Sequence, residues 1–307
     1  MPSIHSPLGA LPARFRRERV LIVGCGDIGL RARALLGKRV RVLALTSSAA
    51  RCDALRAAGI TPLLGDLDAP HSLQRLAGLA TRVLHLAPPT NAGLTDQRTR
   101  DLAAALLRRS APKSLVYGST SGVYGDCQGD WIDETRALRA QTIRAQRRVD
   151  AEVRLRHWAR VTGARMSVLR IPGIYASDRV GGTPRERLLK AMPVLHAQDD
   201  VYTNHIHADD LARACHLALW RGAPQRAYHV SDDTVLKMGD YFDLAADLYG
   251  LARPQRIARE QATALLPAML LSFMQESRRM LNRRMKDELR LRLRYPTVRE
   301  GLQSPGV

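Results

Sequence analysis

The chain has 307 residues and a formal net charge of +19, nearly all of it from arginine. A chain of this length is able to bury a full hydrophobic core and to add a smaller lobe. The sequence has no apolar run of about 18 residues, which predicts that no segment spans a membrane. Its four cysteines form no Cys-x-x-Cys pair. This favours a reduced, cytoplasmic protein over a zinc ribbon or a disulfide scaffold.

The positive charge is spread along almost every expected helix and does not alternate with aromatic side chains. Surfaces that bind nucleic acids usually gather basic residues on one face or tail. The distribution therefore favours solvated arginine faces over a specific nucleic-acid surface. Residues 1–18 contain three prolines and a basic cluster but no apolar core of a signal peptide, which predicts a flexible lead-in.

A glycine turn opens the folded part of the chain. Apolar residues at 20–23 lead into Gly-x-Gly-x-x-Gly at 24–29, and a helix-prone segment follows. The first glycine permits a tight bend, the second lets backbone approach a pyrophosphate, and the third lets the next helix pack closely. The same spacing also suits an ordinary strand-to-helix turn. The residues expected to contact a dinucleotide are Gly24, Gly26, Asp27, Ile28 and Gly29.

Strands and helices then alternate along the chain. The expected strands cover 39–45, 60–64, 82–87 and a segment that begins at 114, and the expected helices cover 49–58, 71–80 and 95–109. Such alternation, at intervals of about 20–30 residues, indicates a parallel sheet with helices on both faces. The predicted fold class is therefore α/β, with a Rossmann-like doubly wound parallel sheet. In this setting the glycine turn is a strong candidate for a cofactor site.

The choice of cofactor depends on residues about 20 positions after the glycines. An acidic residue there would bind the ribose 2′-hydroxyl of NAD, but Ser47 and Ser48 take its place, with Arg51 nearby. Hydroxyl groups beside a guanidinium suit a 2′-phosphate. We therefore prefer NADP slightly over NAD, with these three residues at the adenosine ribose. Alternatively, Ser47 and Ser48 only cap the helix that follows.

Three later segments carry a resemblance to a known family. They are Val116–Asp126, Leu169–Tyr175 and Asn204–Ala212. They are similar to the fifth strand, the sixth strand and the Ile-His-x-x-Asp-Leu-Ala block of extended short-chain dehydrogenases/reductases, the family of nucleotide-sugar epimerases and dehydratases. The resemblance covers residues 19 to about 230. It adds four residues to the expected cofactor contacts, the first of them at the adenine: Asp66, Leu67, Ala87 and Pro172.

The resemblance also implies how the chain divides. An NAD(P)-binding Rossmann domain is expected at 19–175, with 201–230 returning to it. Residues 176–200 and 231–307 would form a smaller, mostly helical C-terminal substrate lobe. Short helices are expected there at Gly239–Tyr249, at Glu260–Phe273 and, rich in arginine, at Ser277–Arg292. Residues 273–279 would border the pocket, or they belong to a solvated amphipathic helix.

The helix that should carry the chemistry departs from the family pattern. The family uses a Tyr-x-x-x-Lys pair, in which the lysine lowers the tyrosine pKa and holds the nicotinamide ribose while the tyrosine transfers a proton. The matching positions are Arg144 and Arg148, and residues 136–154 contain neither tyrosine nor lysine. Arginine is a poor proton shuttle, but Arg148 is able to anchor a ribose or phosphate. The family's catalytic Ser/Thr matches Thr120. Tyr124 is either a substitute proton donor or a ring packed beneath the loop.

Two further patterns bear on the ligand. Nucleotide-sugar members have an arginine that binds the diphosphate, and Thr203 stands at that position. This argues against nucleotide sugars as substrates, unless Arg278 or Arg279 of the C-terminal segment supplies the charge instead. His205 and His207 share a face of an extended segment and precede acidic residues, as metal ligands do. We expect them to be buried structural residues without a metal, with Asp209 capping the next helix.

Together these features predict an NAD(P)-binding oxidoreductase or epimerase with an altered catalytic site, acting on a small hydroxyl or carbonyl compound. Because the Tyr–Lys pair is missing, a non-catalytic NAD(P) sensor that signals to a protein partner is the alternative. The resemblance also suggests a homodimer formed through a pair of helices.

Overall fold

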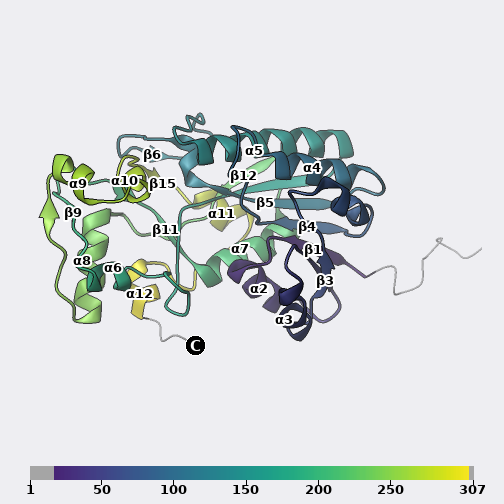
Figure 1. Ribbon diagram of the computed structural model, residues 1–307, viewed down its shortest axis with the longest axis horizontal. Helices are drawn as coiled ribbons and strands as arrows, with labels where there is room; N and C mark the ends of the chain where they lie inside the picture. Colours follow the sequence, from purple (N-terminus) through teal and green to yellow (C-terminus); the bar gives the residue numbers. More distant parts are fainter. Residues whose placement is uncertain (1–16, 304–307) are drawn as a thin grey trace, which may run out of the picture.

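A sheet of seven parallel strands organises the chain in the computed structural model, which describes residues 17–303 (Figure 1). The strand order is β12-β7-β5-β4-β1-β2-β3. The strands are β1 (Arg19–Val23), β2 (Arg41–Thr46), β3 (Thr61–Leu64), β4 (Arg82–His85), β5 (Ser114–Thr120), β7 (Arg165–Ile171) and β12 (Arg226–His229). Chain order reverses between β1 and β4, as in a doubly wound sheet. The predicted α/β fold class is confirmed. Residues 1–16 of the predicted lead-in lie outside the described residues.

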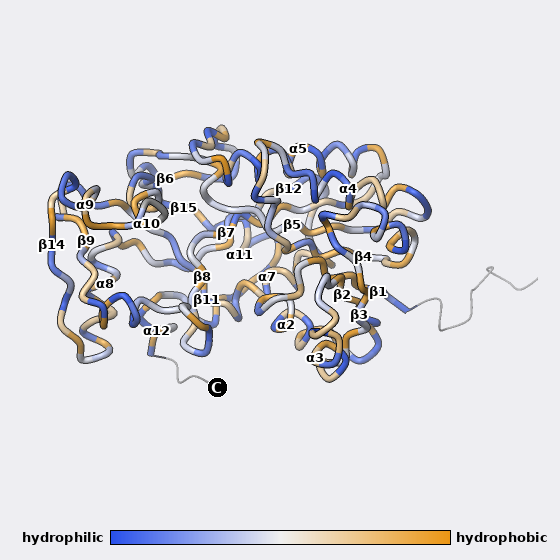
Figure 2. Tube along the Cα trace, in the orientation of Figure 1, coloured by the Kyte–Doolittle hydropathy of each residue, from blue (hydrophilic) through white to orange (hydrophobic). Residues whose placement is uncertain are grey.

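Both faces of this sheet are covered. In β1, Val20 and Ile22 belong to one buried cluster while Leu21 and Val23 belong to another. Alternate residues of a strand point to opposite faces, so a strand covered on both faces needs a continuous apolar run. The first cluster lies under α2 (Asp27–Ala34), α3 (Cys52–Ala57) and α7 (Ala208–Arg221), and the second under α4 (Gln97–Leu107) and α5 (Ile143–Thr162). Figure 2 shows apolar residues along the sheet strands.

A smaller lobe lies beyond one end of the sheet, on the left in Figure 1. A third buried cluster holds it together. Its helices are α6 (Arg185–Leu189), α8 (Met238–Tyr249), α9 (Arg259–Leu265), α10 (Ala268–Phe273) and α12 (Val298–Gln303). It also contains the short strand pairs β9 (Val194–Leu195) with β14 (Arg256–Ile257), and β10 (Tyr202–Thr203) with β13 (Leu236–Lys237). The single helix expected at 260–273 is divided into α9 and α10 at Pro267, because proline interrupts the hydrogen bonds of a helix.

The arginine-rich segment at 277–292 differs from its expected form. It begins with β15 (Arg279–Met280), which pairs with β6 (Trp131–Ile132), and continues with α11 (Arg283–Glu288). Met285 and Leu289 belong to the same buried cluster as Ile22 of β1. This part of the expected lobe therefore packs against the sheet. The other domain boundaries stay a prediction.

Several local boundaries also differ from the sequence prediction. The helix expected at 71–80 is a 3₁₀ helix, η2 (Pro70–Leu76). The helix α5 begins at Ile143, where the Thr142 side chain accepts a hydrogen bond from the Ala145 N–H, so that Arg144 and Arg148 lie in its first two turns. Pro172 separates β7 from β8 (Gly173–Tyr175), which pairs with β11 (His205–His207). No helix among residues 17–303 is long and apolar enough to cross a membrane.

Candidate cofactor site and adjoining cavity

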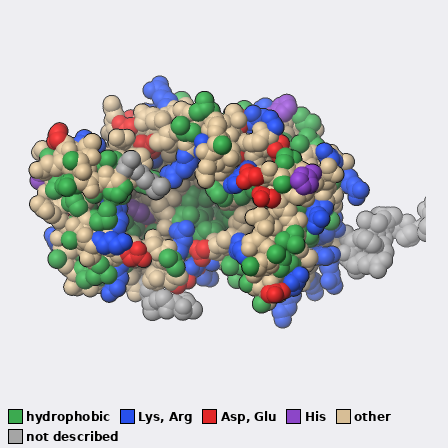
Figure 3. Space-filling view, viewed as in Figure 1, with side chains coloured by type: hydrophobic (Ala, Val, Ile, Leu, Met, Phe, Trp, Pro, Cys, Tyr) green, Lys and Arg blue, Asp and Glu red, His purple; other side chains and the backbone are tan. Residues whose placement is uncertain are grey.

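A cavity of about 920 Å³ lies between the sheet and the lobe. Figure 3 shows it as a hollow in this face of the molecule, with lysine or arginine side chains near its rim. The glycine turn, the end of β5 and the start of α5 line one part of it, and α6, α8 and α10 line another. Ligands of doubly wound folds bind at this place, outside the carboxyl ends of the strands where strand order reverses.

The glycines of the turn have different surroundings. Gly24 has φ +85°, and a Cβ atom built on it would lie 2.3 Å from the Ala87 backbone nitrogen. A Cβ atom on Gly29 would lie 3.2 Å from the side chains of Ile22 and Cys25. A Cβ atom on Gly26 would meet nothing within 4 Å. Gly26 lines the cavity at the N-terminal end of α2, so the open space in front of it fits the pyrophosphate of a dinucleotide.

The residues expected at the adenosine ribose lie near this turn but do not line the cavity. Arg51 donates a hydrogen bond of 2.6 Å from Nη2 to the Cys25 carbonyl oxygen, within the glycine turn. Ser48 is the N-cap residue of η1 (Ala49–Arg51), but its side chain makes no capping hydrogen bond. Asp66 follows β3, and its carboxylate accepts a hydrogen bond from the Asp68 N–H. Three other expected contacts are likewise outside the cavity lining: Asp66, Leu67 and Ala87.

Two arginines of α5 line the cavity. Arg148 donates from Nη1 to the carbonyl oxygen of Gly118 at 2.7 Å and to the Tyr117 hydroxyl at 3.1 Å. Its cation is thereby held at the carboxyl end of β5. The Arg144 guanidinium lies 5.3 Å from the centre of the Phe273 ring, so it connects α5 with α10 of the lobe. The cavity therefore contains arginines where the resemblance places a tyrosine and a lysine.

The two hydroxyl residues proposed for catalysis lie in different surroundings. Thr120 lines the cavity at the end of β5, and its Oγ1 accepts a hydrogen bond of 3.3 Å from the Gly122 N–H. Tyr124 is 1% exposed and does not line the cavity. Its hydroxyl accepts from Arg170 at 2.6 Å and lies 2.5 Å from His229 Nε2. Burial raises the pKa of Tyr124 to about 12. This placement matches the alternative of a packed ring.

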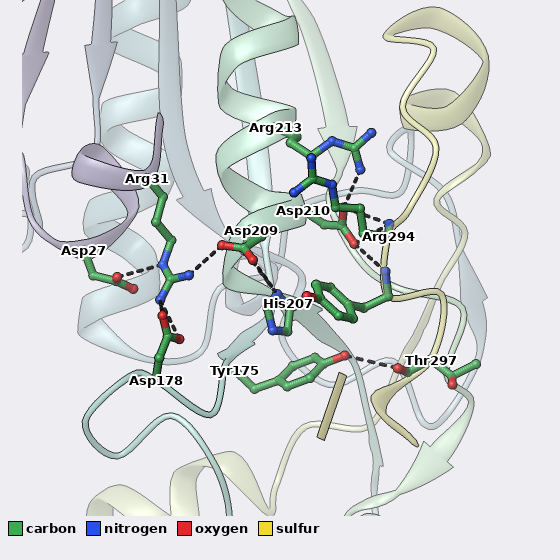
Figure 4. Close-up of polar contacts among 11 residues, drawn as sticks. Asp27, Arg31, Tyr175, Asp178, His207, Asp209, Asp210, Arg213, Arg294 and Thr297 are labelled. Atoms are coloured by element: carbon green, nitrogen blue, oxygen red, sulfur yellow. Dashed lines mark hydrogen bonds and ion pairs between the residues drawn. The ribbon is translucent and has the colours of Figure 1, made fainter. Parts of the chain in front are cut away.

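A cluster of ion pairs joins the glycine turn to the loop that enters the lobe (Figure 4). The Arg31 guanidinium contacts Asp27 at 2.8 Å, Asp178 at 2.6 Å and Asp209 at 2.5 Å. Arg179, which lines the cavity, also pairs with Asp27 at 3.2 Å. The carboxylate of Asp27, at the start of α2, is thus paired with two guanidinium groups, those of Arg31 and Arg179. Local sequence contained no signal for this cluster, because its members come from three distant segments.

The histidines of β11 are buried. His207, not Asp209, is the N-cap residue of α7, because its Nδ1 accepts a hydrogen bond from the Asp209 N–H at 3.2 Å. The imidazole takes this role because its ring reaches the exposed N–H groups of the first helical turn. The His205 ring lies 4.2 Å from the Tyr241 ring, and burial lowers the pKa of His205 to about 4. In the part of the chain that the structure describes, no three His, Cys, Asp or Glu residues are grouped as metal ligands.

The predicted residues are thus only partly brought together. Those that line the cavity are Gly24, Gly26, Asp27, Ile28, Gly29, Thr120, Arg148 and Pro172. Three cavity arginines were missed, Arg147, Arg179 and Arg187. In a chain so rich in arginine, nothing in their local sequence distinguishes them from solvated ones.

Comparison with known proteins agrees with this architecture. The model of the NAD dependent epimerase/dehydratase family matches residues 20–231. Comparison with curated proteins gives no match. A functionally unknown conserved protein from Silicibacter pomeroyi is 28% identical, with 93% of this chain and 97% of that chain covered and a TM-score of 0.74.

Two other solved structures are similar in fold. A putative epimerase from Burkholderia cenocepacia is 16% identical, with 93% of this chain and 96% of that chain covered and a TM-score of 0.73. UDP-glucose 4-epimerase from Thermus thermophilus, solved as a complex with NAD, is 21% identical, with 93% and 96% covered and a TM-score of 0.71.

Proposed function

The chain belongs to the NAD dependent epimerase/dehydratase family, and we propose that it binds NAD or NADP in the cavity as an oxidoreductase or epimerase. Its substrate would be a small hydroxyl or carbonyl compound. The observation that carries the proposal is the continuity of one cavity. It extends from Gly26 past Arg148 and Thr120 to the lobe, so that a cofactor and a substrate would share it.

The residues present fit the expected cofactor. Gly26 leaves space for the pyrophosphate, and Asp66 lies after β3, where the resemblance expects the adenine. Arg148 would hold the nicotinamide ribose or a phosphate, because its guanidinium remains positively charged at any physiological pH. When bound, the nicotinamide ring would accept or donate the hydride.

The choice between NAD and NADP rests on Arg51. Its guanidinium donates a hydrogen bond to the glycine turn. Ser47 and Ser48, which would contact the ribose, directly follow β2. If the cofactor is NADP, Arg51→Ala should weaken NADPH binding at least about tenfold and leave NADH binding unchanged. Arg56→Ala is the control, because Arg56 lies in α3, the helix that follows Arg51, and its side chain is largely exposed. An equal effect of Arg51→Ala on both nucleotides would remove the preference for NADP.

Thr120 is the residue we assign to the substrate oxygen. Its Oγ1 accepts from the Gly122 N–H, which leaves the hydroxyl proton available for a hydrogen bond to the substrate. Arginine is a poor proton shuttle, so the arginines of α5 would stabilise negative charge and not transfer protons.

The experiment that tests this function measures nicotinamide absorbance with a panel of small alcohols, aldehydes and ketones. Thr120→Ala should lower turnover at least about tenfold without weakening cofactor binding, and Thr120→Ser should keep most of it. If cofactor binds but no compound is turned over, the activity proposed here is wrong.

The second candidate function is that of a non-catalytic NAD(P) sensor. The composition of α5 favours it, because this helix contains neither the tyrosine nor the lysine of the family pattern. Arg144 would then connect the cofactor site to the lobe through Phe273. A sensor should bind oxidised and reduced cofactor with different affinities and pass that difference to a protein partner. Equal affinities, measured by calorimetry, would argue against it. The expected homodimer stays a prediction.

A further inference from the structure

The lobe part of the cavity contains a cation without a counter-charge. Arg187 lies on α6, and its guanidinium lies 4.2 Å from the centre of the Phe242 ring. Its Nε and Nη2 atoms are buried and make no hydrogen bond to any described residue. No described carboxylate forms an ion pair with it. Other arginines of the cavity do have polar partners: Arg179 pairs with Asp27, and Arg278 pairs with Glu276.

Burial of an unpaired guanidinium is costly. Moving an ion out of water costs several kcal/mol unless a counter-charge or hydrogen bonds replace the lost hydration. Burial lowers the pKa of Arg187 to about 10, and only the nearby Tyr241 favours its charged form. The ring of Phe242 supplies a weak cation–π attraction, which does not use the N–H donors. An oxyanion entering the cavity would satisfy both the charge and the donors.

Two further polar atoms of residues in this cavity wall are buried and have no hydrogen-bond partner in the described part of the chain. They are Thr203 Oγ1 and His205 Nδ1, and both residues line the cavity with Arg187. His205 and Arg187 contact neighbouring residues of α8, since the His205 ring lies 4.2 Å from that of Tyr241 and the Arg187 guanidinium lies 4.2 Å from that of Phe242. Buried polar groups are paired in nearly all folded proteins. Arg187, Thr203 and His205 thus share one cavity wall, and each carries a buried polar atom with no hydrogen-bond partner among residues 17–303.

We propose that Arg187, with Thr203 and His205, forms a subsite for a carboxylate or phosphate group of the substrate. This inference rests on the proposed function in one respect: the oxygen that reacts would lie at Thr120, in the same cavity. The substrate class is then a small hydroxy or oxo compound with one anionic end. Arg187 would bind that end through paired N–H donors, a geometry that suits both kinds of anion.

The test is calorimetric titration of the full chain with inorganic phosphate and, separately, with malonate, each with and without NAD. We expect saturable binding of at least one anion in both states, and the better probe identifies phosphate or carboxylate as the anionic group. Arg187→Gln should weaken binding at least tenfold, and Arg187→Lys should weaken it less. The control is Arg185→Gln, which removes the same charge from an exposed position of α6 that does not line the cavity.

A second measurement, thermal unfolding, separates loss of anion binding from misfolding of a variant. Because its charge is buried and unpaired, Arg187→Met should unfold at a higher temperature than the wild type without anion, and anion should no longer raise that temperature. Anion binding that is absent in the wild type, unchanged in Arg187→Gln or equally weakened in Arg185→Gln would overturn the proposal. Arg187-dependent anion binding by a chain that binds no nicotinamide cofactor would contradict the proposed function alone.

Discussion

Arg148 donates a hydrogen bond of 2.7 Å from Nη1 to the carbonyl oxygen of Gly118. This bond, with the one to Tyr117, fixes a cation at the end of β5, where the resemblance expects the cofactor-binding lysine. The replacement keeps the charge but removes a group able to titrate near neutral pH. We therefore expect this position to bind the cofactor without taking part in proton transfer.

Removal of this cation should weaken cofactor binding. Arg148→Ala is expected to reduce the affinity for NADH or NADPH at least about tenfold, because the guanidinium would contact ribose or phosphate oxygens. Arg148→Lys should recover part of it. Arg160→Ala is the control, since Arg160 is exposed at the far end of the same helix. Fluorescence titration measures the affinities, and equal binding by Arg148→Ala and the wild type would show that this arginine does not contact the cofactor.

The first two glycines of the turn should respond differently to alanine. In Gly24→Ala, the new Cβ atom would lie 2.3 Å from the Ala87 backbone nitrogen, and the alanine would have to adopt a left-handed φ. This substitution should lower the free energy of unfolding by about 1–3 kcal/mol or more. Gly26→Ala meets nothing within 4 Å and should leave thermal stability unchanged. Its methyl group would nevertheless occupy space needed by the pyrophosphate. Thermal unfolding and nucleotide titration separate the two effects, and a large loss of stability in Gly26→Ala would contradict this geometry.

The buried ion pair between Arg170 of β7 and Glu152 of α5 should contribute strongly to the stability of the fold. The atoms lie 2.8 Å apart, and the side chains are 5% and 1% exposed. Arg170→Met would leave the Glu152 carboxylate buried without its counter-charge, so we expect a loss of about 3–5 kcal/mol in the free energy of unfolding. Arg253→Met is the control, because its pair with Asp247 is exposed and should add nothing measurable. Urea unfolding measures both, and similar effects would refute the assignment.

Acidification should destabilise the protein below pH 6.5. Burial lowers the pKa of His85 and His229 to about 3 and that of His205 to about 4. The unfolded chain takes up these protons near pH 6.5 and the folded chain only near pH 3–4, so stability present above pH 6.5 is lost within this interval. Each histidine contributes at most about 1.4 kcal/mol per pH unit.

Three buried carboxyl groups oppose this trend, because burial raises the pKa of Glu134 and Asp200 as well as that of Asp232. Burial raises the pKa of Asp232 to about 7, so protonation of that carboxyl stabilises the folded state as the pH falls from 7 towards 4. The stabilisation from Asp232 offsets about as much free energy of unfolding as one of the three histidines loses. Urea unfolding at pH 7 and pH 5 should therefore give a lower free energy at pH 5. An equal or higher value at pH 5 would contradict the buried, neutral state of these histidines.

The sequence predicts the Rossmann half of the molecule because its signals are local. A strand covered on both faces must be apolar throughout, and the bend at Gly24 requires glycine, so both features are visible in short segments. Thr120 and Arg148 could be placed for the same reason, since the end of β5 and the first turns of α5 are fixed by the order of elements.

The remaining features depend on pairing between distant segments. The burial of Tyr124 depends on His229, and β15 forms because β6 offers an edge for pairing. The unpaired state of Arg187 is a property of the cavity and has no local signature. Residues of the substrate lobe were accordingly the least predictable part of the site.

If the cavity at the glycine turn holds a nicotinamide dinucleotide, the protein should bind that nucleotide in solution. Calorimetric titration of the wild type and of Gly26→Ala with NAD, NADH, NADP and NADPH tests it directly. We expect saturable binding of at least one nucleotide to the wild type. In a folded Gly26→Ala variant, that affinity should fall at least tenfold. Binding of none of the nucleotides, or equal binding by the two proteins, would contradict it.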